Sequence, residues 1–179
     1  DATRERHKLI EHLNLDADQC VLEVGPGTGR NIPLIARQVR ANVRILTVDI
    51  SAEMLKQCRH RIRKVQLSVD LLEGNVSRLP LATHAVDRVL HFGGFSQFGD
   101  KSQAIREMMR VAKPGATIVI SDKCISPQRH WSWGQKLRAK LFPHLVTEPP
   151  LAMIPLPPQQ IEINWFWNEM AYILCFRNP

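Results

Sequence analysis

Apolar and polar positions along the first two thirds of the chain alternate between two periods, one typical of strands and one typical of helices. Short, largely apolar segments predict five strands, at residues 20–24, 43–48, 66–73, 85–90 and 117–121, of which 20–24 has the pattern of a buried strand and 43–48 alternates. Apolar residues at helical spacing predict amphipathic helices between them, at residues 3–13, 32–39, 52–64 and 102–111. Strands and helices that alternate in this way are typical of an α/β protein with a parallel sheet.

The last third of the chain has a different pattern. Residues 131–142 predict a short amphipathic helix, and residues 143–158 contain six of the 12 prolines, which excludes a regular helix or strand there. Residues 161–167 alternate like a strand and residues 171–176 follow closely, so we expect an antiparallel hairpin. Trp165 and Trp167 would then face the core with the isoleucines of that strand, whereas Trp131 and Trp133 are candidates for a lid or an apolar surface.

Composition adds limits to this picture. A chain of 179 residues with 44% hydrophobic residues can bury the core of one domain. No apolar run approaches the ~20 residues of a membrane span, and the N-terminus lacks the pattern of a secretory signal. The four cysteines form no C-x-x-C pair. These features predict a cytoplasmic protein with reduced thiols.

The positive charge is concentrated in one region. Nine of the 24 lysines and arginines fall within residues 30–64, which contain only two acidic residues. Most of these cations lie at the ends of predicted helices, which in a doubly wound sheet point away from the ligand-binding edge. We therefore favour a solvated back edge, with a patch that binds RNA or a membrane as the alternative for this cluster.

Candidate chemistry is concentrated at the ends of the predicted strands. The first strand contains Glu23 and runs into Gly25-Pro-Gly-Thr-Gly29, a turn that can bring backbone N–H groups close to a ligand. The second strand ends at Asp49, and the third is followed by Gly74-Asn75-Val76. Two further motifs are His91-Phe92-Gly93 after the fourth strand and Lys113-Pro114-Gly115 before the fifth. A glycine turn alone is a weak signal, but five motifs in this order are specific.

Together these motifs resemble the class I S-adenosylmethionine-dependent methyltransferases, over residues 21–121. Residues 104–115 and His91-Phe92-Gly93 are most similar to the ubiquinone/menaquinone C-methyltransferase branch and related small-molecule enzymes. The resemblance implies a single Rossmann-like domain with a mostly parallel seven-stranded sheet, in the order third, second, first, fourth, fifth, seventh, sixth. Its parts would be an N-terminal helix (1–15), a cofactor-binding core (21–121), a proline-rich acceptor-side segment (122–160) and a closing hairpin (161–176).

The resemblance also implies roles for individual residues toward S-adenosylmethionine. Asp49 would accept hydrogen bonds from the ribose hydroxyls, and Glu23 would orient the glycine turn or reach the amino group of the methionine tail. Asn75 departs from the family's usual aspartate, but its side-chain oxygen can still accept from the adenine amino group. The expected cofactor-binding residues are Glu23, Gly25, Gly27, Gly29, Asp49, Ile50, Asn75, Val76, His91, Phe92 and Gly93.

The acceptor side is less well defined by the sequence. His91 is the candidate general base, and a histidine that packs beside the cofactor without a proton role is an equal alternative. Asp122, Lys123 and His130 are candidates for the border of the acceptor pocket. No metal is expected, because a sulfonium already activates its methyl group.

The expected function is methyl transfer to a small, hydrophobic acceptor such as a quinone, polyketide or lipid, with a membrane surface as a further candidate partner. The alternatives are an RNA or protein methyltransferase, a cofactor-binding module without turnover and, least favoured, an NAD-dependent oxidoreductase. The oxidoreductase shares the glycines and the later acidic residue, but the G-x-G-x-G spacing and the Lys-Pro-Gly turn favour a methyltransferase. The sequence leaves the acceptor and the oligomeric state open.

Overall fold

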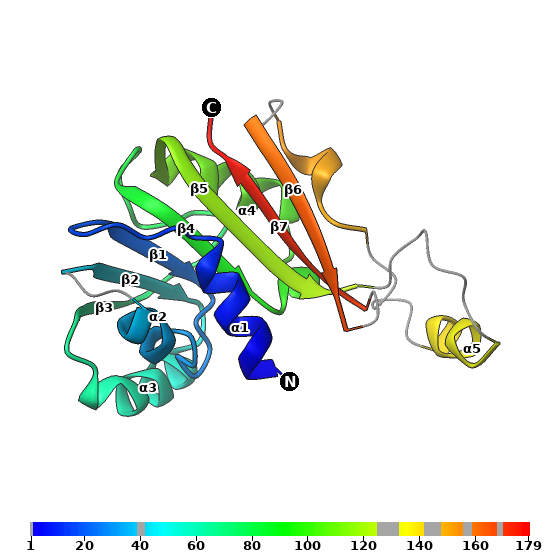
Figure 1. Ribbon diagram of the computed structural model, residues 1–179, viewed down its shortest axis with the longest axis horizontal. Coiled ribbons are helices and arrows are strands. Elements are labelled where there is room, and N and C mark those ends of the chain that lie inside the picture. Colours follow the sequence, from blue (N-terminus) through cyan, green and yellow to red (C-terminus); the bar gives the residue numbers. More distant parts are fainter. Residues whose placement is uncertain (1, 39–41, 125–132, 142–147, 156–158, 168–169) are drawn as a thin grey trace.

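The central feature of the fold is one mixed β-sheet, seen in a computed structural model that describes residues 2–38, 42–124, 133–141, 148–155, 159–167 and 170–179. The strands in these ranges form a seven-stranded sheet in the order β3-β2-β1-β4-β5-β7-β6 (Figure 1). The first five strands are parallel, and β7 is antiparallel to both β5 and β6. The expected strand order and closing hairpin are confirmed.

The strands lie close to their predicted positions, because parallel strands covered by helices are rich in apolar residues. They are β1 (Cys20–Val24), β2 (Arg44–Asp49), β3 (Ser68–Glu73), β4 (Val86–Phe92), β5 (Ala112–Lys123), β6 (Gln159–Phe166) and β7 (Ala171–Arg177). Strand β5 begins earlier than predicted. Its Lys113-Pro-Gly turn lies within the strand as a bulge, since the register with β4 shifts after the Val86–Ala112 pair.

Helices cover both faces of the sheet. The covering helices are α1 (Ala2–Glu11), α2 (Ile32–Gln38), α3 (Ala52–Arg61) and α4 (Lys101–Val111). Helix α5 (Trp133–Leu141) lies apart from both faces (Figure 1), and short 3₁₀ turns form η1 (Ile62–Lys64), η2 (Phe95–Gln97) and η4 (Leu151–Met153). Buried residues of α1, α2 and α3 form a core on one face, and those of α4 form a core on the other. The Ser51 side chain caps α3 as predicted, and Asp100 caps α4 in the same way.

Two predictions for the last third need correction. Trp167 does not continue the apolar face of β6, because the strand ends at Phe166 and Trp167 has a left-handed backbone with φ of 50°. Trp165, in contrast, packs edge-on against Tyr172 in the core as expected. The proline-rich segment also contains regular structure, since η4 forms one helical turn there.

The parallel arrangement brings the functional candidates to one edge of the sheet. Val24, Asp49 and Phe92 are the last residues of β1, β2 and β4, and the antiparallel β7 starts at the same edge, where Ala171 pairs with Lys123. Arg44, a member of the cation cluster, lies at the opposite edge. No helix in the described ranges is long and apolar enough to span a bilayer. His130 and Trp131 lie outside the described residues.

Candidate functional site

Different constraints act on the two ends of the glycine turn after β1. Gly25 has φ of 63°, its N–H donates to the Val48 carbonyl at 2.8 Å, and a side chain there would meet the His91 ring at 3.6 Å. At Gly29 a Cβ would lie 2.5 Å from the Sγ of Cys58, so only glycine lets α3 pack against the turn. Gly25 therefore fits a ligand-facing position, whereas Gly29 is explained by packing.

Asp49 ties the end of β2 to the glycine turn. One carboxylate oxygen accepts from the Gly27 N–H at 3.0 Å, and the other accepts from the Ser51 N–H at 2.9 Å. Each oxygen has a further lone pair for a ligand hydroxyl, since a carboxylate offers about four acceptor sites. The carboxylate thus stabilises the turn, and its remaining lone pairs can accept hydrogen bonds from a ligand at the edge of the sheet.

A cavity of about 450 Å³ opens beside Asp49. Gly25, Asp49, Ile50, Asn75 and Val76, all predicted cofactor contacts, line it together with residues of the η2–α4 region. The Asn75 side-chain oxygen accepts from the Ser77 N–H at 2.8 Å, which fixes the amide at the cavity wall. We refer to this space, lined by the ends of β1, β2 and β3, as the cofactor cavity.

A buried network that the sequence did not reveal lies behind the glycine turn. The Asn31 amide donates to Glu23 Oε1 at 2.7 Å, and Arg6 from α1 donates to the Asn31 side-chain oxygen. The Arg6 guanidinium also lies 4.1 Å from the centre of the Phe92 ring. Arg6 and Asn31 carry no motif in the sequence, because this cluster exists only once α1, β1 and β4 have packed together.

Glu23 is the acidic side chain of this network, and its burial disfavours the charged form. Its side chain is 1% exposed, and among the described residues its Oε2 atom has no hydrogen-bond partner. Burial raises the pKa of this carboxyl to about 7, although the Asn31 amide and Arg6 act in the opposite direction. A buried carboxylate oxygen without a partner is available to a cationic or hydrogen-bond-donating ligand.

His91 is fixed in one orientation behind the turn. Its Nδ1–H donates to the Val24 carbonyl at 2.8 Å, whereas Nε2 is buried and has no partner in the described part of the chain. Burial lowers the pKa of the imidazole below its usual value, which favours the neutral ring. The ring packs beside Phe95 and Phe98, and it lies behind the walls of the cavities described here instead of lining them.

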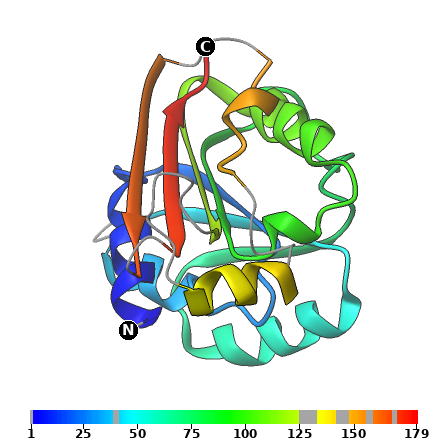
Figure 2. The ribbon, with the colours of Figure 1, turned by 90° about the vertical axis from the view of Figure 1, so that its right-hand side faces the viewer.

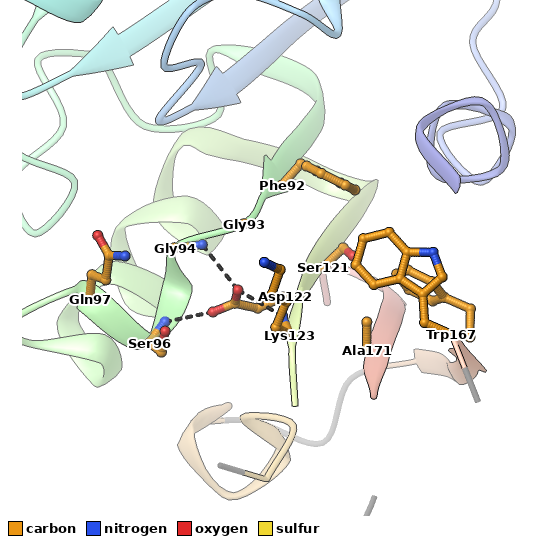
Figure 3. Close-up of a pocket in the computed structure, with 11 residues that line it drawn as sticks. Phe92, Gly93, Gly94, Ser96, Gln97, Ser121, Asp122, Lys123, Trp167 and Ala171 are labelled. Carbon is orange, nitrogen blue, oxygen red and sulfur yellow. Dashed lines mark hydrogen bonds between the residues drawn. The ribbon is translucent and has the colours of Figure 1, made fainter. Parts of the chain in front are cut away.

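A second cavity, of about 320 Å³, lies past the end of β4 (Figure 3). Phe92, Phe166 and Trp167 give it apolar walls, and Asp122 and Lys123, the candidates for the border of the acceptor pocket, line its polar side. Its remaining lining residues are Gly93, Gly94, Ser96, Gln97, Ser121 and Ala171. Gln97 also lines the cofactor cavity, so the two spaces are neighbours. We call this second space the apolar cavity.

Asp122 stabilises the η2 turn, which lies between the two cavities. Its carboxylate accepts from the backbone N–H groups of Gly94 at 3.0 Å, Ser96 at 2.7 Å and Lys123 at 2.8 Å (Figure 3). The first two bonds fix the start of η2, the turn that carries Gln97. The sequence suggested Asp122 as a pocket residue, but not this bracing of the turn.

Replacing Asp122 by alanine is expected to lower the free energy of unfolding by about 2 kcal/mol, because three backbone donors lose a charged acceptor. Chemical denaturation measures this change. Asp100→Ala is the matched control, since it removes an exposed helix cap that is worth about 1 kcal/mol. Equal losses in the two variants would contradict a special role for Asp122 in holding η2.

Comparison with known proteins identifies the family. A family model described as "Methyltransferase domain" matches residues 22–120, more than half of the chain. The chain belongs to this methyltransferase family. The match spans the glycine turn, Asp49, Asn75 and the Lys113-Pro-Gly bulge, so the class I S-adenosylmethionine-dependent resemblance is confirmed, with S-adenosylmethionine as the cofactor.

Curated relatives of this methyltransferase act in quinone biosynthesis by name. The ubiquinone/menaquinone biosynthesis C-methyltransferase UbiE of Klebsiella pneumoniae is 30% identical over 121 residues, 64% of this chain and 48% of that protein. A demethylmenaquinone methyltransferase of Lactiplantibacillus plantarum is 29% identical over 153 residues, 80% of this chain and 65% of that protein. The chain thus spans about half the length of the UbiE proteins that it matches.

Solved structures share the fold at low sequence identity. A SAM-dependent methyltransferase from Aquifex aeolicus aligns with a TM-score of 0.73 at 18% identity, and covers 100% of this chain and 94% of its own. A geranyl diphosphate C-methyltransferase from Streptomyces coelicolor, crystallised with S-adenosyl-L-homocysteine, aligns with a TM-score of 0.76 at 16% identity, over 99% of this chain and 81% of its own. These likenesses confirm the seven-stranded methyltransferase sheet.

The described residues fit the family's cofactor. Asp49 offers acceptor capacity at the mouth of the cofactor cavity, the backbone at Gly25 allows close approach, and Glu23 presents a buried oxygen without a partner. Of the residues predicted to bind the cofactor, five line this cavity, and Phe92 and Gly93 line the apolar cavity instead. Gly27 contributes through its bond to Asp49, whereas Gly29 packs against α3.

Proposed function

We propose that this chain binds S-adenosylmethionine in the cofactor cavity and promotes transfer of its methyl group to a small, hydrophobic acceptor in the apolar cavity. The observation that carries this proposal is the pair of neighbouring cavities that share Gln97 at the carboxyl edge of the sheet. Two substrates held side by side on a rigid edge can react with little loss of entropy at the moment of transfer.

The residues of the cofactor cavity would each hold one part of the cofactor. Asp49 would accept from the ribose hydroxyls through its remaining lone pairs, and the Asn75 oxygen and Val76 N–H would meet the adenine ring. Ile50 would cover the adenosine with its apolar side chain. Glu23 would act on the methionine tail, directly or by holding the turn. When bound, S-adenosylmethionine supplies a methyl group already activated by its positive sulfur.

The apolar cavity favours an acceptor with an apolar body. Phe92, Phe166 and Trp167 form its walls, and aromatic rings bury large apolar areas. The names of the curated relatives refer to quinones, and one solved structural neighbour was crystallised with geranyl diphosphate. We propose a quinone, polyketide or lipid as the acceptor class, with a quinone as the first candidate.

We infer that His91 positions the glycine turn and does not act as a base. Its Nδ1–H holds the Val24 carbonyl and its ring supports Gly25. His91→Asn keeps an N–H donor but cannot take up a proton, so we expect methyl transfer to persist within about threefold. Steady-state kinetics as a function of pH measures this. A loss of kcat greater than about a hundredfold with unchanged cofactor affinity would show instead that His91 is the base.

A methyl-transfer assay tests the proposed function. The full chain is incubated with S-adenosylmethionine labelled in its methyl group, and label is counted in the organic extract after addition of demethylated quinones, polyketides or lipids. Label in the extract supports the proposal. Label in RNA or protein with none in the extract, or cofactor binding without turnover on any acceptor, would contradict it and favour one of the two alternatives.

A further inference from the structure

Helix α5 presents an unusual row of exposed apolar side chains. Trp133, Leu137 and Leu141 are spaced four residues apart, so they share one face of the helix. Their side chains are 81%, 45% and 65% exposed, respectively. A helix of a soluble protein normally buries such a face, so this row indicates a surface that binds something.

The charges of α5 show what kind of surface it would bind. The charged residues of the helix are Lys136, Arg138 and Lys140, and none is acidic. A helix that combines an apolar row containing tryptophan with lysine and arginine is typical of segments that lie in the interface of a membrane. Two copies of α5 would place six cations together, which makes self-association through this face unfavourable.

The position of α5 connects this surface with the proposed site. Figure 1 shows α5 beyond the carboxyl end of β5, set apart from the layers of the fold, and Figure 2, which looks onto that side, shows α5 in the foreground. The apolar cavity lies at that edge, and the exposed side chain of Met170 also lies there. Apolar side chains on this edge would therefore face the same surface as α5.

We propose that α5 is an interfacial helix that docks the protein onto an anionic lipid bilayer and turns the carboxyl edge of the sheet, with the apolar cavity, toward the lipid. Trp133, Leu137 and Leu141 would enter the boundary between headgroups and acyl chains, and the net positive charge of the helix would favour an anionic surface. The helix has nine residues, so it lies on the membrane and does not cross it.

Vesicle flotation with the full chain tests this docking without any need for turnover. We expect binding to vesicles of equimolar phosphatidylcholine and phosphatidylglycerol, weaker binding at high salt, and little binding to pure phosphatidylcholine. Trp133→Ser combined with Leu137→Ser should weaken the binding by at least about tenfold. Neutralising Lys136, Arg138 and Lys140 with glutamine should remove the preference for anionic vesicles.

Ile161→Ser is the matched control. Ile161 is 45% exposed, as Leu137 is, but it lies near the start of β6, away from the cavity edge. This variant should bind vesicles like the wild type, and circular dichroism should show that all variants keep the fold. The proposal is overturned if the wild-type protein binds neither type of vesicle, or if Ile161→Ser weakens binding as much as the α5 variants do. It is also overturned if ultracentrifugation shows that the wild type is a dimer and that the α5 substitutions convert it into monomers.

Discussion

Replacing Asp49 by alanine should weaken the binding of S-adenosylhomocysteine by more than about tenfold. The carboxylate braces Gly27 and Ser51 at once, and it is the proposed acceptor for the ribose hydroxyls. Alanine removes both functions, so the glycine turn loses its link to β2 and the ligand loses a charged acceptor. Isothermal titration calorimetry on each variant measures the change directly.

Two further variants separate these contributions. Glu73, the register partner of Asp49 on β3, is exposed and does not line the cofactor cavity, so Glu73→Ala should leave the affinity unchanged. Asp49→Asn keeps one neutral oxygen for the Gly27 N–H and should lose less affinity than alanine does. Equal affinity of Asp49→Ala and the wild type would remove Asp49 from the site.

The second large effect concerns the pH dependence of stability. The pKa of Glu23 is about 7 in the folded protein and near 4.5 when exposed, so between these values the folded state holds a proton that the unfolded state has lost. Stability from this group is therefore fully present below pH 4.5 and is lost as the pH rises to about 7. The loss amounts to about 3 kcal/mol. Denaturant unfolding of the ligand-free protein across this range measures it.

Glu23→Gln isolates this contribution from other titrating groups. Glutamine keeps an oxygen for the Asn31 amide but has no charge to bury, so at about pH 8 the variant should be the more stable protein by up to about 3 kcal/mol. His91 has the opposite slope, because its lowered pKa makes stability fall as the pH drops below its usual value. Because both proteins contain His91, its contribution cancels when the free energy of unfolding of the wild type is subtracted from that of the variant. If the difference in the free energy of unfolding between Glu23→Gln and the wild type did not change with pH, the raised pKa assigned to the buried Glu23 would be contradicted.

The sequence predicted the sheet well because its signals are local. Strands β1 to β4 are short, largely apolar segments, and each is followed by a motif that indicates which end of the strand would bind the ligand. The Lys113-Pro-Gly segment was predicted as a turn and lies in a bulge of β5, since the neighbouring strand continues to pair across it. Trp167 was placed in the core by alternation, but the strand ends one residue earlier and the side chain lines the apolar cavity.

Contacts between distant segments could not be predicted in this way. Arg6 meets Asn31 and Phe92 only after α1 packs across the sheet, and Gln97 joins the two cavities through a turn that Asp122 holds from another strand. Arg6, Asn31 and Gln97 have no local spacing that marks them as site residues. The placement of Phe92 and Gly93 in the apolar cavity likewise depends on how β4 and β5 end beside the hairpin.

The central claim is that the edge formed by the glycine turn, Asp49 and Asn75 is a site for S-adenosylmethionine in this chain. Calorimetric titration of the purified chain with S-adenosylhomocysteine, beside the Asp49→Ala variant, tests it most directly. We expect one site per chain in the wild type and at least about tenfold weaker binding in the variant. An absence of binding heat in the wild type, with S-adenosylmethionine giving the same result, would contradict the account.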